Sequence, residues 1–176
     1  GVQTCALPIL MLLQHARAPA RFAEDGSAVP LEAQDRSLWR QPLIAEGLAL
    51  IDKAVRHRQP GPYLVQAAIA ALHARAARWE DTDWAEIELL YGTLERLQPS
   101  PVITLNRAVA VSRIRGPAAA LELIEPLEDK LSAYFYFHGA RGAFLKQMGR
   151  NEEAIRAYDE VVTRFGMAPE TAIREL

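Results

Sequence analysis

The sequence has little of what most catalytic and nucleic-acid-binding sites require. It has one cysteine, Cys5, and its four histidines are too far apart to form a typical metal-ligand spacing. Glycine-rich phosphate loops and the Gly-x-Ser-x-Gly nucleophile motif are absent. The formal net charge is −2, so there is no excess of positive charge to attract a nucleic-acid backbone. We therefore expect no catalytic centre, no metal, no cofactor and no direct binding of nucleic acid.

Long apolar runs are also absent. No stretch approaches the roughly 20 apolar residues that a membrane-spanning helix needs, and the first residues lack the basic region of a signal peptide. Of the 176 residues, 50% are hydrophobic and 24% are charged, which is typical of a globular domain with a sizeable core. The scarcity of cysteine fits a reducing compartment, and we expect a cytoplasmic protein.

Proline marks the starts of several predicted helices. Four prolines follow a residue that can precede a helix, namely Pro42, Pro62, Pro101 and Pro117. Asp83 with Glu86 three residues later resembles a capping box. No segment alternates as a strand would, and residues 18–40 are expected to be irregular. The predicted helices cover residues 10–17, 42–57, 62–78, 84–97, 101–114, 117–129, 132–148 and 151–165.

The chain also repeats itself at a separation of 34 residues. Apolar positions of one copy are matched in the next: Ala108 by Gly142, Val111 by Leu145, Ile114 by Met148, Ala120 by Ala154, Leu121 by Ile155, Ile124 by Tyr158, and Leu127 by Val161. Thirty-four residues is the period of the tetratricopeptide repeat, a helix pair that stacks on copies of itself. A third, degenerate copy contains Ile87, Tyr91, Leu94 and Pro99. We therefore predict an all-α fold, an antiparallel helix-pair stack of the tetratricopeptide-like α-solenoid type.

The expected organisation has three parts. Residues 1–9 resemble one reading frame of a sequencing-library adapter, which we interpret as a non-native segment; a native apolar helix end is the alternative. Residues 10–60 are expected to form an N-terminal helical part. Residues 61–176 are expected to hold the helical repeats.

Polar and aromatic residues interrupt the apolar pattern at three places. They comprise Asp35, Arg36 and Trp39 before the 42–57 helix, Tyr63 with Gln66, and Asn106 with Arg107. We interpret them as a structural polar cluster in which Asp35 and Arg36 hold the irregular segment against the helices through paired hydrogen bonds. A partner-binding site is the alternative.

The repeat register brings four polar positions together on first helices of the repeats. These candidate partner-binding residues are Ser112, Arg113, Lys146 and Gln147. They can present donors and positive charge to an acidic protein segment. Ordinary solvated helix surface is the alternative.

Several short motifs occur in a fixed order along residues 10–168. They are Asp35-Arg36-Ser37-Leu38-Trp39, Ile44-Ala45-Glu46-Gly47-Leu48, Gly61-Pro62-Tyr63 with Gln66-Ala67-Ala68-Ile69-Ala70-Ala71, Thr82-Asp83-Trp84, Leu90-Tyr91, and Pro99-Ser100-Pro101-Val102 with Leu105-Asn106-Arg107-Ala108-Val109-Ala110-Val111. Together they resemble the C-terminal extension of bacterial extracytoplasmic-function RNA polymerase sigma factors that carry a tetratricopeptide-like tail. At Leu64 or Val65 that family more often has glutamine.

The resemblance implies a regulatory, protein-interaction domain rather than an enzyme. In that family the promoter-reading domains precede the tail, and neither is present in this sequence. The implied partners are those sigma domains, the polymerase core that they contact, and a possible regulatory protein. A free-standing tetratricopeptide-like scaffold that binds a peptide or small ligand is the alternative.

Overall fold

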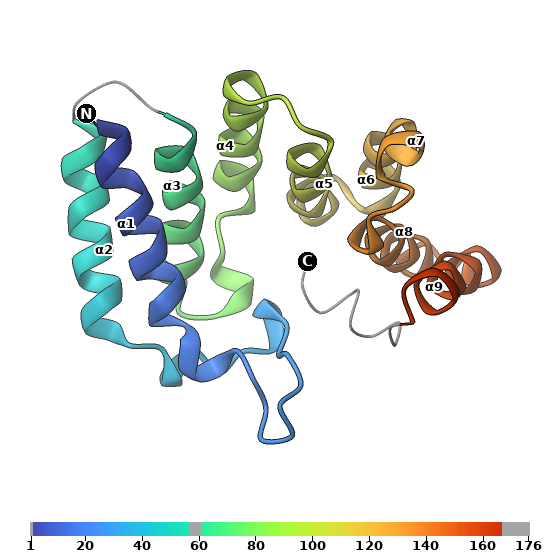
Figure 1. The fold of residues 1–176 in the computed structure, drawn as a ribbon, viewed down its shortest axis with the longest axis horizontal. Coiled ribbons are helices and arrows are strands. Elements are labelled where there is room, and N and C mark those ends of the chain that lie inside the picture. The colour runs from blue at the N-terminus through green and yellow to red at the C-terminus, as the bar shows by residue number, and fades with distance from the viewer. Residues whose placement is uncertain (1, 57–60, 167–176) are drawn as a thin grey trace. The chain divides into compact units, whose positions relative to one another are not determined.

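The computed structural model describes residues 2–56 and 61–166, which form helices joined by turns and, between residues 16 and 41, by a longer irregular segment (Figure 1). Within these residues the only strand-like feature is an isolated antiparallel bridge between Phe22 and Ala28. The α-helices are α1 Val2–Ala16, α2 Gln41–Val55, α3 Pro62–Arg75, α4 Trp84–Leu97, α5 Pro101–Arg115, α6 Pro117–Ile124, α7 Glu128–Leu131, α8 Phe135–Gln147 and α9 Asn151–Phe165. The 3-10 turns are η1 Ala18–Ala20, η2 Leu31–Ala33, η3 Arg36–Leu38, η4 Trp79–Asp81 and η5 Glu125–Leu127. The prediction of an all-α helical stack is confirmed.

The helix starts follow the predicted caps. Each of the four predicted prolines lies in the first turn of its helix, in α2, α3, α5 and α6. At α4 the Asp83 carboxylate accepts a hydrogen bond of 2.9 Å from the Glu86 backbone N–H. The first backbone N–H groups of a helix have no partner within the helix. A capping carboxylate accepts a hydrogen bond from one of them, and a proline in the first turn has no N–H that could remain unpaired.

Four helix boundaries differ from the prediction by three or more residues, and one of them is the end of the helix expected over 62–78, which lies at Arg75. The helix expected over 117–129 ends at Ile124, because Pro126 has no N–H to continue the α-helical ladder, and η5 and the single turn α7 replace its second half. The helix expected from residue 132 begins at Phe135. The helix expected from residue 10 begins at Val2, so residues 2–9, interpreted above as non-native, are part of α1.

The first compact unit, Gly1–Pro99, contains α1 to α4. Helices α1, α2 and α3 pack against one another, and α4 packs on α3. Their shared core consists of Ala6, Ile9, Leu13, Ile51, Ala54, Leu64, Ala67, Ala70 and Ala71. A Cβ on Gly47 of α2 would lie 2.7 Å from Leu13 Cδ2, so glycine allows α1 and α2 to approach closely. The division expected at residue 60 falls inside this unit.

The second compact unit, Ser100–Leu176, contains α5 to α9. Helix α5 pairs with α6, α8 pairs with α9, and α6 packs against α8. The core includes Leu105, Ala108, Val111, Ala120, Ile124, Leu131, Phe137, Ala140, Phe144, Leu145, Ala154 and Ala157. In α8, a Cβ on Gly142 would clash with the ring of Tyr158, which explains why this repeat position has no side chain.

The 34-residue repeat is visible in the burial of equivalent residues. Val111 and Leu145 are 1% and 2% exposed, as predicted. The equivalence fails at Leu121, which is 4% exposed, and Ile155, which is 58% exposed. The reason is that α6 is covered by α8, whereas within residues 2–56 and 61–166 α9 packs extensively only against α8.

Candidate binding site at the Trp39 cluster

The irregular segment between α1 and α2 is held by local hydrogen bonds. Residues 21–29 form a tight hairpin in which Val29 N–H donates to Arg21 O over 2.8 Å, and Gly26 takes the positive φ of +80° at its turn. Further along, the Arg40 N–H donates to Ala16 O, the last residue of α1, over 2.9 Å. The segment therefore leaves α1 and returns to the same place before α2 begins.

Trp39 is the apolar anchor of this segment. It is 3% exposed and packs with Ala16, Ala20 and Ile44. Two guanidinium groups lie near its ring, with the Cζ atoms of Arg36 and Arg17 at 4.7 Å and 5.5 Å from the ring centre. Both distances are within the range of cation–π attraction.

Arg36 joins the segment to the end of α3. Its Nη1 donates to the backbone oxygens of His73 and Ala76, both at 2.6 Å. These are carbonyls at the C-terminal end of α3, where the helix dipole favours a cation. Burial lowers the pKa of Arg36, and the nearby acidic residues Glu80 and Asp81 oppose that shift. Asp35 acts locally, because its carboxylate accepts the Ser37 N–H over 2.9 Å at the start of η3.

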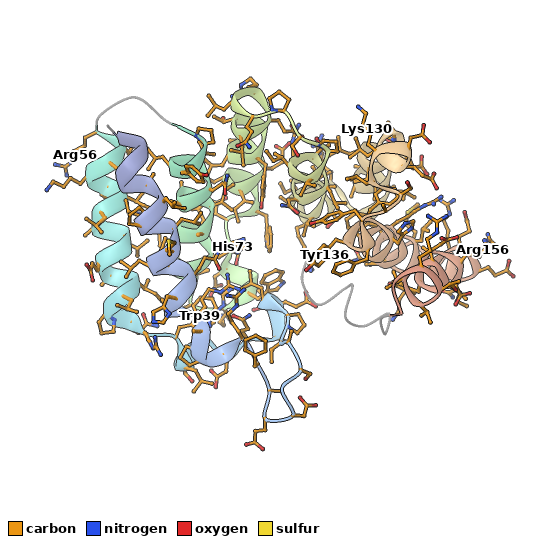
Figure 2. All side chains as sticks on the ribbon, viewed as in Figure 1. Trp39, Arg56, His73, Lys130, Tyr136 and Arg156 are labelled. Atoms are coloured by element: carbon orange, nitrogen blue, oxygen red, sulfur yellow. The ribbon has the colours of Figure 1, made fainter. Side chains whose placement is uncertain are left out.

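An aromatic group continues from His73 towards α4. The His73 and Trp79 rings are stacked with centres 6.2 Å apart, and Trp84 meets both rings edge-on at 5.3 Å and 4.7 Å. Burial, followed by the charges of Arg17 and Arg36, lowers the pKa of His73 to about 4. His73 is therefore neutral at pH 7. Figure 2 shows Trp39 and His73 near each other at one end of the helices of this unit.

Arg17 approaches the cluster from the end of α1. Its Nε donates to Gln34 Oε1 over 3.3 Å, and Gln34 Nε2 in turn donates to Val29 O over 3.0 Å. Burial, followed by the positive charges of Arg21 and Arg36, lowers the pKa of Arg17 to about 10. We call Arg17, Gln34, Arg36, Trp39, His73, Trp79 and Trp84 the Trp39 cluster.

Some polar atoms at this end of the unit are enclosed without a hydrogen-bond partner among the described residues. They are Arg36 Nη2, Trp39 Nε1, His73 Nδ1 and Thr82 Oγ1. Each such group costs about 1–3 kcal/mol relative to a hydrogen-bonded one. This end of the unit therefore has buried polar atoms that form no hydrogen bond with the described residues.

The structure separates the other residues of the predicted polar cluster from Trp39. Tyr63, which is exposed, and Gln66 lie in the first half of α3, whereas Arg36 contacts its last turn. Asn106 and Arg107 lie in α5 of the second unit, both partly buried.

The four candidate partner-binding residues lie near the C-terminal ends of α5 and α8. The Ser112 hydroxyl donates to Val109 O of its own helix over 2.7 Å. Arg113, Lys146 and Gln147 are exposed.

Sequence reasoning missed Arg17, His73, Trp79 and Trp84 as members of one cluster. Their signal in the sequence is weak, because they lie in separate segments and each is compatible with ordinary helix-end packing. Among the described residues no group of three or more His, Cys, Asp and Glu side chains is arranged to hold a metal ion. None of the helices in the described part of the chain has the length and apolarity needed to span a membrane.

Comparison with known proteins gives two matches. A family of unknown function, DUF6596, matches residues 2–55, a range that includes Arg17, Gln34, Arg36 and Trp39 and ends before His73. An uncharacterized protein of Rhizobium meliloti (strain 1021) is 63% identical over 166 residues, which are 94% of this chain and 39% of that relative. The larger part of the relative thus lies outside the match. No solved structure matches the chain significantly.

Proposed function

We propose that this chain is the C-terminal regulatory and protein-interaction domain of an extracytoplasmic-function RNA polymerase sigma factor, acting in the cytoplasm without enzymatic activity. The observation that carries the proposal is the ordered series of motifs from Asp35 to Val111, which resembles the tail of those sigma factors. The series runs through both compact units, from η3 to α5.

The fold supports a role in binding protein. Helix pairs that stack on one another, as α5–α6 and α8–α9 do, present extended surfaces of exposed side chains along their helices. The similar Rhizobium meliloti protein is much longer than this chain, which leaves room for promoter-reading domains in a protein of that length. In the proposed function those domains contact the polymerase core, and this chain regulates them.

The candidate contact surface is formed by Ser112, Arg113, Lys146 and Gln147. Lys146 and Gln147 are exposed in the last turn of α8, where they are accessible to a partner. The partner complementary to these positive charges is an acidic segment, either of the sigma domains or of a separate regulator. The test of this surface is the double charge reversal Arg113→Glu with Lys146→Glu in the full-length protein.

A prediction about DNA separates a regulatory tail from a promoter-binding domain. With a net charge of −2, the chain should bind duplex DNA no more tightly than about 10 µM at physiological salt, and without sequence preference. Fluorescence anisotropy with labelled duplexes from the region upstream of its own gene, compared with scrambled duplexes, measures this. Sub-micromolar binding that favours the genuine duplex over the scrambled one would contradict the proposal.

A further inference from the structure

The Trp39 cluster contains two arginines, Arg17 and Arg36, that form no ion pair within the part of the chain that the structure describes. Exposed arginines such as Arg75, Arg78 and Arg150 do form ion pairs. Arg36 is partly compensated by the two carbonyls at the end of α3 and by the nearby carboxylates of Glu80 and Asp81. Arg17 has the neutral Gln34 amide and the face of the Trp39 ring, neither of which carries a negative charge.

The surroundings of Arg17 add to this imbalance. Its side chain is partly buried against Trp39, and the two charges that lower its pKa, those of Arg21 and Arg36, are both positive. Removing a cation from water is unfavourable unless an anion or several hydrogen bonds replace its hydration. The site therefore favours an anion over any neutral ligand.

The geometry of Arg17 leaves its terminal nitrogens available. Nε is held by Gln34, which is itself 8% exposed and fixed by Val29 O, so the direction of the guanidinium is set. Arg36 Nη2 and Trp39 Nε1 are enclosed, whereas the Arg17 Nη atoms are not among the enclosed polar atoms and make no hydrogen bond to a described residue. Two parallel N–H donors on a fixed guanidinium match the two oxygens of a carboxylate or phosphate.

We propose that Arg17 binds the oxyanion of a small carboxylate or phosphate ligand through Nη1 and Nη2, in the positive field of Arg21 and Arg36. Trp39 holds the two guanidinium groups in place, and Arg36 acts through its charge rather than by contact. This site is independent of the proposed role in transcription and gives the chain a small ligand of its own.

The test is a titration of the purified chain with inorganic phosphate and, separately, with acetate, at an ionic strength held constant with sodium chloride. The indole N–H signal of Trp39 in a proton–nitrogen NMR spectrum reports binding. We expect saturable shifts with one of the two anions, at a dissociation constant of about 1 mM, typical of one bidentate charge-assisted contact. The preferred anion identifies the ligand class.

Substitutions of single arginines distinguish a specific anion site at Arg17 from general ion binding. Arg17→Gln should weaken the affinity for the anion at least about tenfold. Arg17→Lys should weaken it less, because lysine keeps the positive charge although it lacks the two parallel N–H donors of arginine. Arg96→Gln, at an exposed arginine near the end of α4, is the matched control and should leave the affinity unchanged. Helix content measured by circular dichroism checks the fold of each variant.

Three results would overturn the proposal. They are no saturable shift with either anion, equal shifts with sodium chloride alone, and an affinity unchanged in folded Arg17→Gln. If Arg17→Gln does not fold, Arg21→Gln decides: the proposal requires a loss of affinity of about two- to fivefold from the weakened field, and an unchanged affinity contradicts it.

Discussion

Replacing Phe137 with alanine should lower the free energy of unfolding by about 3–5 kcal/mol. Phe137 is 0% exposed and shares the core of the second unit with Leu105, Ile124 and Leu131. Removing its ring loses the transfer free energy of a large apolar group and leaves a cavity that helices on several sides cannot fill. Urea unfolding followed by circular dichroism measures the change.

The repeat provides a matched pair of controls in the same unit. Leu121→Ala should cost about 2–5 kcal/mol, because Leu121 of α6 is 4% exposed and belongs to the core of the second unit. Ile155→Ala, at the equivalent position one repeat later, should change stability by no more than about 0.5 kcal/mol because Ile155 is 58% exposed. Equal losses at the two positions would mean that α9 is covered in solution.

Replacing Trp39 with alanine should cost the first unit about 3–5 kcal/mol. Trp39 is almost fully buried, and its ring is the surface against which Arg17 and Arg36 lie. Without the ring both arginines lose their cation–π partner, and the segment from residue 17 to residue 40 loses its main apolar contact with α2. Urea unfolding is again the measurement.

The control for this variant is Trp39→Phe. Phenylalanine keeps an aromatic face for both guanidinium groups and removes Trp39 Nε1, which has no hydrogen-bond partner among the described residues. The free energy of unfolding should fall by about 1–2 kcal/mol, less than half the fall expected for the alanine variant. A loss as large as that of Trp39→Ala would show that the indole N–H contributes a hydrogen bond in solution.

Local signals in the sequence were sufficient for most helix starts. A proline in the first turn of a helix and a carboxylate at its cap act within a few residues, so Pro62, Pro101 and Asp83 predicted α3, α5 and α4 correctly. The end of α6 was missed although Pro126 is visible in the sequence, because the apolar pattern continues across it to Leu127. There the missing N–H of Pro126 ends the α-helix even though the apolar period continues.

The Trp39 cluster shows what local patterns do not contain. Its members come from the end of α1, the irregular segment, the end of α3 and the turn before α4, and only the packing of these elements brings them together. The sequence pointed to Arg36 and Trp39 as a polar-aromatic pair. It contained no local sign that Arg17 and His73 would meet that pair, since contacts between distant segments depend on the arrangement of the helices.

The most direct test of the proposed function is competition for the polymerase core. A full-length sigma factor that carries this chain as its C-terminal part, as the proposal requires, is titrated against a complex of core RNA polymerase with a fluorescently labelled primary sigma factor. We expect the full-length protein to displace the label at sub-micromolar concentration, the chain of residues 1–176 alone not to displace it, and the Arg113→Glu, Lys146→Glu double variant to change the concentration required. Failure of the full-length protein to displace the labelled sigma factor, or displacement by residues 1–176 alone, would contradict the assignment of this chain as a regulatory tail.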